Sequence, residues 1–473
     1  MISLKDAANI FYNHYPRYLE LSLYKKRIKH SDIIPLINKL KNNNKFDVSL
    51  AGSSFLGNEI FLIKTGSGKN KIFLWSQMHG DESTATMAIF DMINFLQSND
   101  EFDTFRNNLL EKNTIFFLPM VNPDGTEFYQ RRNFAEIDIN RDFLRQESPE
   151  TKVLCNIYNM LKPDFGFNLH DQSERYSVGN SCKQAAISFL APPVDELKTI
   201  TPNREKAMQL IAALNSAIQD IIPGHIAKYS DEFEPRAFGD NFQKSGMSTI
   251  LLESGGWKGD NQKQFLRKIN FVLLMTAFES ITTDDYKNFD VSDYDMIPEN
   301  GKMIMDLVLR NLVLNSEAGK IKIDIGVNRE ELTKNGEVFY KSLIEDMGDL
   351  SIYYGLEDYD MNGFVIQPGK ILNKVFTSYD QIKNKNFNEY YLNGITDLVI
   401  SDTLSDPQFT SLPINIVGNI THTDHFENIL KPGMPADFVL LKNEKIAFIV
   451  LNGFLFNVST RAGKIHNGVV KLA

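Results

Sequence analysis

The 473-residue sequence contains only two cysteines, Cys155 and Cys182. Two cysteines in so long a chain provide neither a framework of disulfide bonds nor the four thiolates of a structural zinc site. They are typical of a protein kept in a reducing compartment, and we expect each to take the place of a small buried apolar side chain.

Dense basic segments and long apolar runs are also missing. The formal net charge is -10, and the one compact basic run, Lys25-Lys26-Arg27, is expected on the solvent-exposed face of a helix. This charge balance argues against a nucleic-acid or anionic-membrane partner. No apolar run reaches the length of a membrane-spanning helix, and charged residues interrupt the N-terminal segment before it could form the apolar core of a secretory signal. We therefore expect a cytoplasmic protein.

Apolar residues make up 42% of the sequence and include 34 phenylalanines, enough for two sizeable cores. The length predicts two or three domains. Residues 1–284 form the first predicted domain, which begins with a helical segment at 1–44. The pattern then alternates predicted strands with predicted helices, which indicates an open α/β sheet. The main strands are predicted at 71–76, 114–121, 164–169 and 249–252, and the main helices at 84–98, 149–161, 204–222 and 260–281.

Three of these strands end at candidate site residues. His79 and Glu82 follow the first strand, His170 follows the third and Glu253 follows the fourth. Because the carboxyl ends of such strands meet at one edge of a sheet, these side chains are expected to lie together. Histidine and carboxylate are zinc ligands, and a catalytic zinc site uses three protein ligands and keeps one position for water.

Together these residues resemble the zinc carboxypeptidase family, over about residues 45–280. The resemblance lies in HGDE at 79–82, NPDG at 122–125, the pair Arg131-Arg132 followed by DINRDF at 138–143, His170 and Glu253. It implies a mixed, open twisted sheet flanked by helices. It also implies one zinc ion and a peptide or acylated amino acid as the substrate.

The resemblance implies a role for each residue of the metal centre. His79, Glu82 and His170 are identified as the zinc ligands, which leaves a position for water. Glu253 is identified as the general base that takes a proton from the zinc-bound water and passes it to the leaving amine. Asp138 would accept a hydrogen bond from His79 and fix its tautomer.

The same resemblance implies three substrate contacts. Arg131 would polarise the scissile carbonyl and stabilise the oxyanion. It is preferred to Arg132 because its spacing to Asn140 and Arg141 is similar to that in carboxypeptidases D and E. Asn140 and Arg141 would bind the terminal carboxylate of the substrate, since a guanidinium can make a bidentate contact with a carboxylate.

One family position departs from the pattern. The family usually carries a tyrosine that closes over the substrate, but the expected position falls near Asp240 and the tyrosine at a longer spacing is Tyr229. This departure leaves the choice of substrate open more than the hydrolysis itself. Arg236 could recognise a substrate carboxylate, although a pair with a nearby aspartate is the simpler interpretation.

Residues 285–473 form the second predicted domain, in which apolar residues recur with period two between turns. This pattern predicts a β-rich domain with one or more short helices, such as 379–384. Segments 305–312 and 433–441 show a weaker resemblance to the small β-domain of amidohydrolases. His422 and His425 lie in a polar loop with no third ligand nearby, so we do not expect a metal there. The domain is expected to be structural, to position the substrate or to bind a partner.

Three hypotheses for the function follow. The first is a zinc carboxypeptidase that removes a C-terminal residue, from a peptide or from a cell-wall peptide. The second is an N-acyl amino acid deacylase of the aspartoacylase type on the same scaffold. The third is an inactive peptide-binding protein. NPDG and the long spacer to Glu253 favour the first, and the complete set of ligands, base and arginine argues against the third. The oligomeric state is not predicted.

Overall fold

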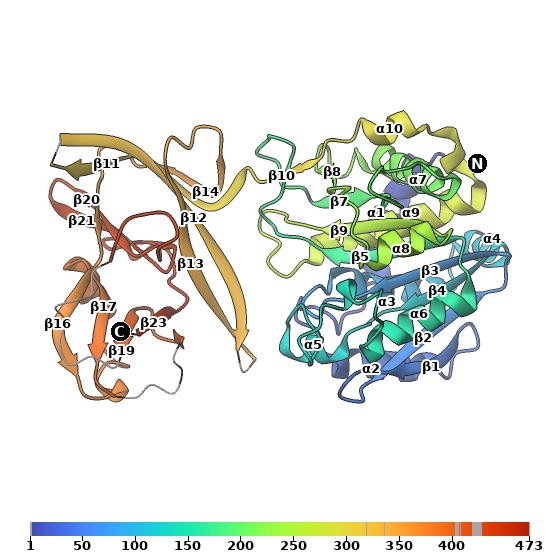
Figure 1. Cartoon of the computed structure of the whole chain (residues 1–473), viewed down its shortest axis with the longest axis horizontal. Helices are drawn as coiled ribbons and strands as arrows, with labels where there is room; N and C mark the ends of the chain where they lie inside the picture. The colour runs from blue at the N-terminus through green and yellow to red at the C-terminus, as the bar shows by residue number, and fades with distance from the viewer. Residues whose placement is uncertain are drawn as a thin grey trace. The chain divides into compact units, whose positions relative to one another are not determined.

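The computed structural model divides the chain into two compact units, Met1–Lys302 and Met303–Ala473 (Figure 1). The sequence predicted a division at 284 and 285. Residues 285–302 lie instead with the first unit, because Tyr286 packs on Phe165 and the Tyr294 hydroxyl accepts a hydrogen bond from the Ala191 amide. The structure describes residues 2–317, 319–334, 336–402, 406, 408–418 and 428–472.

The first unit is built on a mixed eight-stranded sheet. The strands β4, β3, β5 and β9 lie side by side and parallel, whereas β2 runs antiparallel to both β1 and β4, and β7 runs antiparallel to β9. This confirms the predicted mixed α/β fold. In spatial order the strands are β1 (Asp47–Ser53), β2 (Glu59–Gly66), β4 (Asn113–Leu118), β3 (Asn70–Ser76), β5 (Phe165–Asp171), β9 (Ser248–Ser254), β7 (Ile187–Leu190) and β8 (Ile226–Lys228).

Helices cover both faces of this sheet, as Figure 1 shows. Side chains alternate between the faces of a strand, so Ile72 and Leu74 of β3 pack in one apolar core while Phe73 and Trp75 pack in the other. The first core includes residues of α1 (Leu4–His14), α3 (Thr84–Gln97), α7 (Pro202–Ile218) and α9 (Gln264–Thr283), and the second those of α6 (Pro149–Leu161) and α8 (Phe238–Lys244). The remaining helices of the unit are η1 (Tyr15–Arg17), α2 (His30–Leu40), α4 (Asp103–Lys112), α5 (Pro123–Phe128), η2 (Ile139–Arg141), η3 (Asp285–Asn288) and α10 (Val291–Asp295).

Local sequence signals determine where several helices begin. α6 follows Ser148, whose hydroxyl accepts a hydrogen bond from the Thr151 amide, and Pro149 occupies its first position. α7 begins in the same way after Thr201. A Ser or Thr cap followed by proline is favoured because the oxygen satisfies an unpaired amide and proline has none to satisfy.

The predicted N-terminal helical segment contains α1 and α2, and a buried ion pair fastens the chain that joins them. The Arg267 guanidinium lies 2.6 Å from the Asp91 carboxylate, and the Tyr15 hydroxyl donates to the same carboxylate at 2.9 Å. Asp91 lies on α3 and Arg267 on α9, so this pair ties three segments of the first core together.

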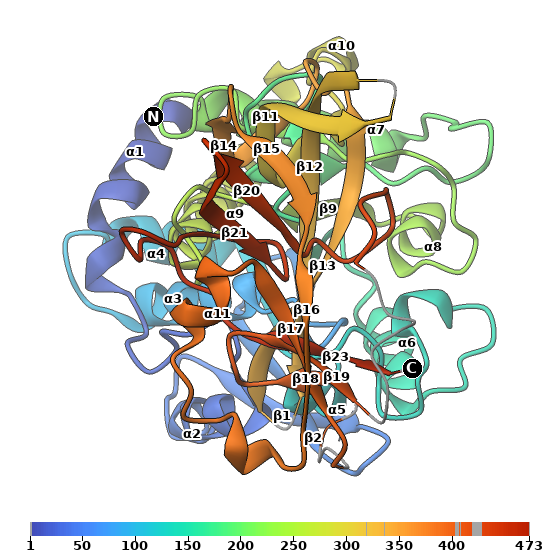
Figure 2. The same ribbon diagram turned by 90° about the vertical axis from the view of Figure 1, so that its left-hand side faces the viewer.

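The second unit is β-rich, as predicted, and Figure 2 shows its strands. It contains two sheets and three apolar clusters, the smallest of which is formed by Met305, Val308 and Leu350. The helices among its described residues are η4 (Tyr379–Gln381), within the predicted 379–384, and α11 (Phe387–Leu392). The first sheet contains β13 (Glu337–Gly348), β12 (Gly319–Lys334), β11 (Ile304–Ser316), β15 (Val365–Pro368), β20 (Phe438–Lys442), β21 (Lys445–Leu451) and β22 (Phe454–Asn457), with β14 (Tyr354–Asp360) beside β11. The second contains β16 (Lys370–Phe376), β17 (Ile395–Ile400), β19 (Asn415–Gly418), β23 (Gly468–Leu472) and β18 (Phe409–Thr410).

In the first unit the short strands β6 (Ser177–Val178) and β10 (Asn300–Gly301) form a separate pair. His422 and His425 lie outside the described residues. Within the described ranges, no helix is both long enough and apolar enough to cross a membrane.

Candidate metal centre

The predicted ligands meet at the carboxyl edge of the central strands. His79 and Glu82 lie between the end of β3 and the start of α3, whereas His170 lies in β5. β5 pairs with β9 in a register that sets His170 opposite Glu253. The parallel strands therefore bring together residues that are far apart in the sequence, as the edge-of-sheet argument predicted.

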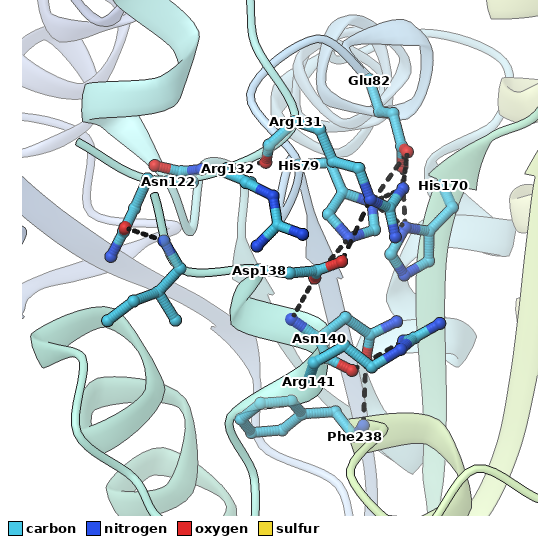
Figure 3. A network of polar contacts seen from close by, with 12 residues as sticks. His79, Glu82, Asn122, Arg131, Arg132, Asp138, Asn140, Arg141, His170 and Phe238 are labelled. Atoms are coloured by element: carbon cyan, nitrogen blue, oxygen red, sulfur yellow. Dashed lines mark hydrogen bonds and ion pairs between the residues drawn. The ribbon is translucent and has the colours of Figure 1, made fainter. Parts of the chain in front are cut away.

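The three predicted ligands converge on one point (Figure 3). Glu82 Oε1 lies 2.7 Å from His79 Nδ1, Glu82 Oε2 lies 2.7 Å from His170 Nδ1, and the two Nδ1 atoms are 3.1 Å apart. All three side chains are buried. Ligands about 2.0–2.1 Å from a tetrahedral zinc lie about 3.3 Å from each other. The spacing and the chemistry of this donor set thus fit a zinc ion.

Asp138 holds the first histidine from its far side. His79 Nε2 lies 3.2 Å from Asp138 Oδ1, so an Nε2 proton donated to this carboxylate leaves the Nδ1 lone pair directed at Glu82 and His170. Burial alone would raise the pKa of Asp138, but the hydrogen bond with His79 and the charges of His79 and Arg131 lower it. Asp138 is therefore a carboxylate, as an acceptor for His79 must be.

The two carboxyl groups of the centre have pKa values displaced in opposite directions. Burial would raise the pKa of Glu82, yet the neighbouring His79 and His170 lower it below the ordinary glutamate range. Burial raises the pKa of Glu253 well above that range, and the negative charge of Glu82 raises it further. Two nearby carboxyls with such different proton affinities are typical of a site that uses one as a ligand and the other for proton transfer.

The structure places Arg131, but not Arg132, against this centre. Arg131 Nη1 lies 3.2 Å from His79 Nδ1 and 3.3 Å from Glu82 Oε1, while its Nε donates to Asp138 at 3.1 Å. Arg132 instead donates to the Glu136 carbonyl at 2.9 Å. The geometry agrees with the preference for Arg131 drawn from the spacing.

Two sequence motifs make contact behind the ligands. Asn122 begins α5, because its side-chain oxygen accepts a hydrogen bond from the Gly125 amide at 2.9 Å. The NPDG segment is therefore the start of a helix in addition to the turn that its composition predicted. A Cβ atom on Gly80 would lie 2.1 Å from the Gly125 carbonyl carbon, so the glycine between His79 and Glu82 allows this close approach.

Asn140 and Arg141 lie on η2, directly after Asp138. Asn140 Oδ1 accepts a hydrogen bond from the Phe238 amide at 3.0 Å, and the Arg141 guanidinium lies 3.2 Å from the Glu234 carboxylate. Both residues and the centre border one cavity of about 360 Å³. Its lining also contains Tyr229, the candidate for the missing lid tyrosine, and Asp240.

Several lining residues were not predicted as site residues. Tyr176 lies with its ring 6.1 Å from that of Tyr229, and no local sequence signal distinguishes it. Asp171 directly follows His170 and accepts a hydrogen bond from Thr84 at 2.6 Å, while burial raises its pKa to about 7. Its place beside a predicted ligand at a strand end was a signal that could have identified it. Arg236 pairs with an acidic neighbour as expected, but with Glu234 in place of an aspartate.

The fold and the convergent ligands define the first unit as an α/β domain with a candidate metal centre. A family model described as zinc carboxypeptidase matches residues 34–238, which confirms the resemblance seen in the motifs. The match lies within the first unit and includes His79, Glu82, His170, Arg131 and Asn140-Arg141.

Similar proteins of known name match over short segments. Carboxypeptidase 2 of Trichophyton tonsurans is 27% identical over 108 residues, which are 23% of this chain and 20% of that protein. Carboxypeptidase D of Drosophila melanogaster is 32% identical over 106 residues, covering 17% of this chain and 8% of that protein. The chain thus spans about a fifth or less of the length of these relatives. A metallo-carboxypeptidase structure from Burkholderia cenocepacia is similar with a TM-score of 0.43 at 15% identity, over 54% of this chain and 69% of that one.

Proposed function

We propose that this protein is a zinc-dependent metallocarboxypeptidase that hydrolyses the C-terminal peptide bond of its substrate. The observation that carries the proposal is the convergence of His79, Glu82 and His170 beside a buried Glu253. The two Nδ1 atoms and the Glu82 carboxylate would hold one zinc ion. When bound, zinc supplies a Lewis acid that polarises a carbonyl and lowers the pKa of a water molecule.

Glu253 would move the proton in this reaction. Hydrolysis adds a hydroxyl group to the scissile carbonyl carbon and a proton to the leaving amine nitrogen. As a carboxylate, Glu253 takes the proton from the attacking water and then donates it to that nitrogen as the C–N bond breaks. A pKa held above the ordinary glutamate range by burial makes the carboxylate a stronger base than a solvated one.

The other residues of the cavity would bind and orient the substrate. Arg131 would donate hydrogen bonds to the carbonyl oxygen as negative charge develops there. Asn140 and Arg141 would hold the terminal carboxylate, which restricts cleavage to the last peptide bond. Asp138 would keep His79 in the tautomer that presents Nδ1 to the metal.

The metal requirement is tested by measuring zinc content and hydrolysis on the same protein. We expect one zinc per chain, hydrolysis of N-blocked dipeptides, and loss of both after treatment with a chelator. His170→Ala should lose zinc, because it removes one of three ligands. Zinc-free protein with full activity would contradict the proposal. A parallel set of N-acyl amino acids distinguishes a deacylase, which would cleave these and leave the dipeptides intact.

A further inference from the structure

The guanidinium assigned to the substrate carboxylate already has a carboxylate partner in this chain. Arg141 Nε lies 3.2 Å from Glu234 Oε2. The Arg141 side chain is 36% exposed and that of Glu234 is 27% exposed, so both lie at the border of the cavity, where a ligand can reach them.

Glu234 is also bound to a second guanidinium. Arg236 Nε donates to Glu234 Oε1 at 2.9 Å, and Arg236 Nη2 donates to Glu234 Oε2 at 2.8 Å. The hydrogen bonds from Arg236 hold the pKa of Glu234 below the ordinary glutamate value, so the residue is ionised. The Glu234 carboxylate thus accepts two hydrogen bonds from the Arg236 guanidinium and also forms an ion pair with Arg141.

The backbone around Glu234 is fixed by α8 and by the segment after η2. The Glu234 amide donates to Asp240 Oδ1 at 3.1 Å, and the Ala237 amide donates to the Glu234 carbonyl at 2.9 Å. The Phe143 amide donates to the Arg236 carbonyl at 3.3 Å. The Glu234 carboxylate therefore stands beside Arg141 because the fold holds it there.

We propose that Glu234 is a specificity-determining residue, an internal carboxylate that competes with the terminal carboxylate of the substrate for Arg141. A substrate binds by taking over the Arg141 contact, while Glu234 remains paired with Arg236. This inference rests on the proposed function, in that Arg141 binds a substrate carboxylate. It adds a residue pair, Glu234 and Arg236, that sets how tightly that carboxylate is held.

The charges around the cavity favour this competition. In the described lining the arginines are Arg131, which contacts the metal centre, and Arg141. Glu232 and Asp240 also line the cavity, so Arg141 is the guanidinium that must offset these acids and attract an anionic end group. While Glu234 is bound to it, the electrostatic attraction for a second carboxylate is reduced. Displacing Glu234 from Arg141 nevertheless costs little free energy, because Arg236 continues to pair with Glu234.

Two neighbouring substitutions should shift affinity in opposite directions. Glu234→Gln removes the competing charge and should lower KM for peptides with a free C-terminus by about 2- to 5-fold, the range for one exposed ion pair. Arg236→Ala leaves Glu234 to Arg141 alone and should raise KM by a similar factor. Because Arg236 acts through Glu234, Arg236→Ala should change nothing further in the Glu234→Gln background. In each case kcat should change little, since neither residue contacts the reacting atoms.

A binding experiment separates this inference from the hydrolysis. The probes are benzoyl-Gly-Gly and its C-terminal amide, titrated calorimetrically into zinc-loaded protein carrying Glu253→Gln so that neither is cleaved. Adding Glu234→Gln should tighten binding of the acid by about 2- to 5-fold, and adding Arg236→Ala should weaken it. The amide should bind equally well in all variants. Glu232→Gln is the matched control, since it removes the same charge from the same cavity without a contact to Arg141 in the described part of the chain, and its effect on the acid should be smaller.

The outcomes are distinct. An acid-to-amide affinity ratio that is the same in all variants would overturn the competition, as would failure of Glu234→Gln to bind either probe. A ratio that shifts as expected supports the role of Glu234 even if wild-type protein cleaves no peptide, in which case the proposed hydrolysis alone fails. Thermal unfolding of each variant shows whether the loop around Glu234 remains folded.

Discussion

Each of the two units buries a cluster of charged side chains, and the clusters differ in what surrounds them. In the first unit, Glu82 and Glu253 lie with two histidines beside an open cavity. In the second unit, Asp397 and Asp437 are fully buried and both pair with Lys471, at 2.6 Å and 2.9 Å. A buried charge is costly in either place unless a partner compensates for it.

In the second unit, the charged and polar side chains of the cluster bind one another. The Asn428 side chain donates to Asp397 Oδ2 at 2.7 Å and accepts a hydrogen bond from Lys471 at 2.8 Å. Burial would lower the pKa of Lys471, but Asp437 and Asp397 more than reverse this and raise it. Asp397 lies on β17, Lys471 on β23 and Asp437 just before β20, so the cluster joins the two sheets of the unit.

The difference lies in how the charges are compensated. Around Lys471 the charged partners are supplied within the protein. Around Glu82 and Glu253 the pKa values of two adjacent carboxyls move apart, and the groups border space that a metal and a substrate can enter. Burial of charge alone therefore does not identify a functional site, whereas burial beside a cavity together with opposed pKa shifts identifies a candidate for one.

The largest predicted effect is a loss of activity on substitution of Glu253, which tests whether the cluster of the first unit is catalytic. Glu253→Gln should lower kcat by about 10²–10⁴-fold, because the amide cannot accept the proton of the attacking water. Zinc content should stay unchanged, since Glu253 is not one of the three converging ligands. The measurements are steady-state hydrolysis of N-blocked dipeptides and metal analysis of the same preparation.

The stability of the variant supplies the control for Glu253→Gln. Removing a buried carboxylate with a raised pKa should leave the first unit at least as stable as before. A variant that loses activity together with its folded structure would say nothing of proton transfer, and one that keeps full activity would remove Glu253 from the mechanism.

The second prediction concerns the cluster of Lys471, Asp397 and Asp437 in the second unit. Lys471→Met leaves Asp397 and Asp437 buried without their cation, and the free energy of unfolding of the second unit should fall by about 3–5 kcal/mol. Hydrogen exchange at the amides of β17 and β23 measures this loss, and peptide hydrolysis by the first unit should be retained. Lys445→Met is the matched control, because Lys445 is exposed on β21 and its loss should cost little. Equal destabilisation by both substitutions would refute the assigned role of the cluster.

The sequence predicted the parts of the site that local signals specify. His79 and Glu82 follow β3, whereas His170 and Glu253 lie near the carboxyl ends of β5 and β9, and these strand ends meet at one edge of the sheet. The β-rich character of the second unit was also predicted, because burial of one face of a strand imposes a period of two on the sequence.

Contacts between segments that are distant in the sequence could not be predicted from it. Arg141 meets Glu234, and Lys471 meets Asp397 and Asp437, only after strands and helices have packed. No spacing rule relates such residues, and charged side chains in a sequence are usually solvated. The division after Lys302 was missed for the same reason, since the polar composition near residue 284 does not show that Tyr286 and Tyr294 are buried in the first unit.

The smallest predicted effect is a change in stability on substitution of Asp240. This buried acid of the first unit lines the cavity and, unlike Asp397 and Asp437, has no salt bridge in the described part of the chain. Burial raises its pKa to about 6, above the value of about 3.9 expected when the chain is unfolded. A raised pKa in the folded state means that the stability contributed by this group is present below pH 4 and is lost as the pH rises to 6 and above.

Asp240→Asn removes the cost of the buried charge and keeps an oxygen that can accept the hydrogen bond from the Glu234 amide. The variant should therefore exceed wild type in unfolding free energy by about 2 kcal/mol at pH 7.5 and match it at pH 4. Denaturant unfolding at the two pH values measures the difference. An equal gain at both pH values would show that the charge of Asp240 does not cause the difference and is compensated within the fold, like the charges paired with Lys471.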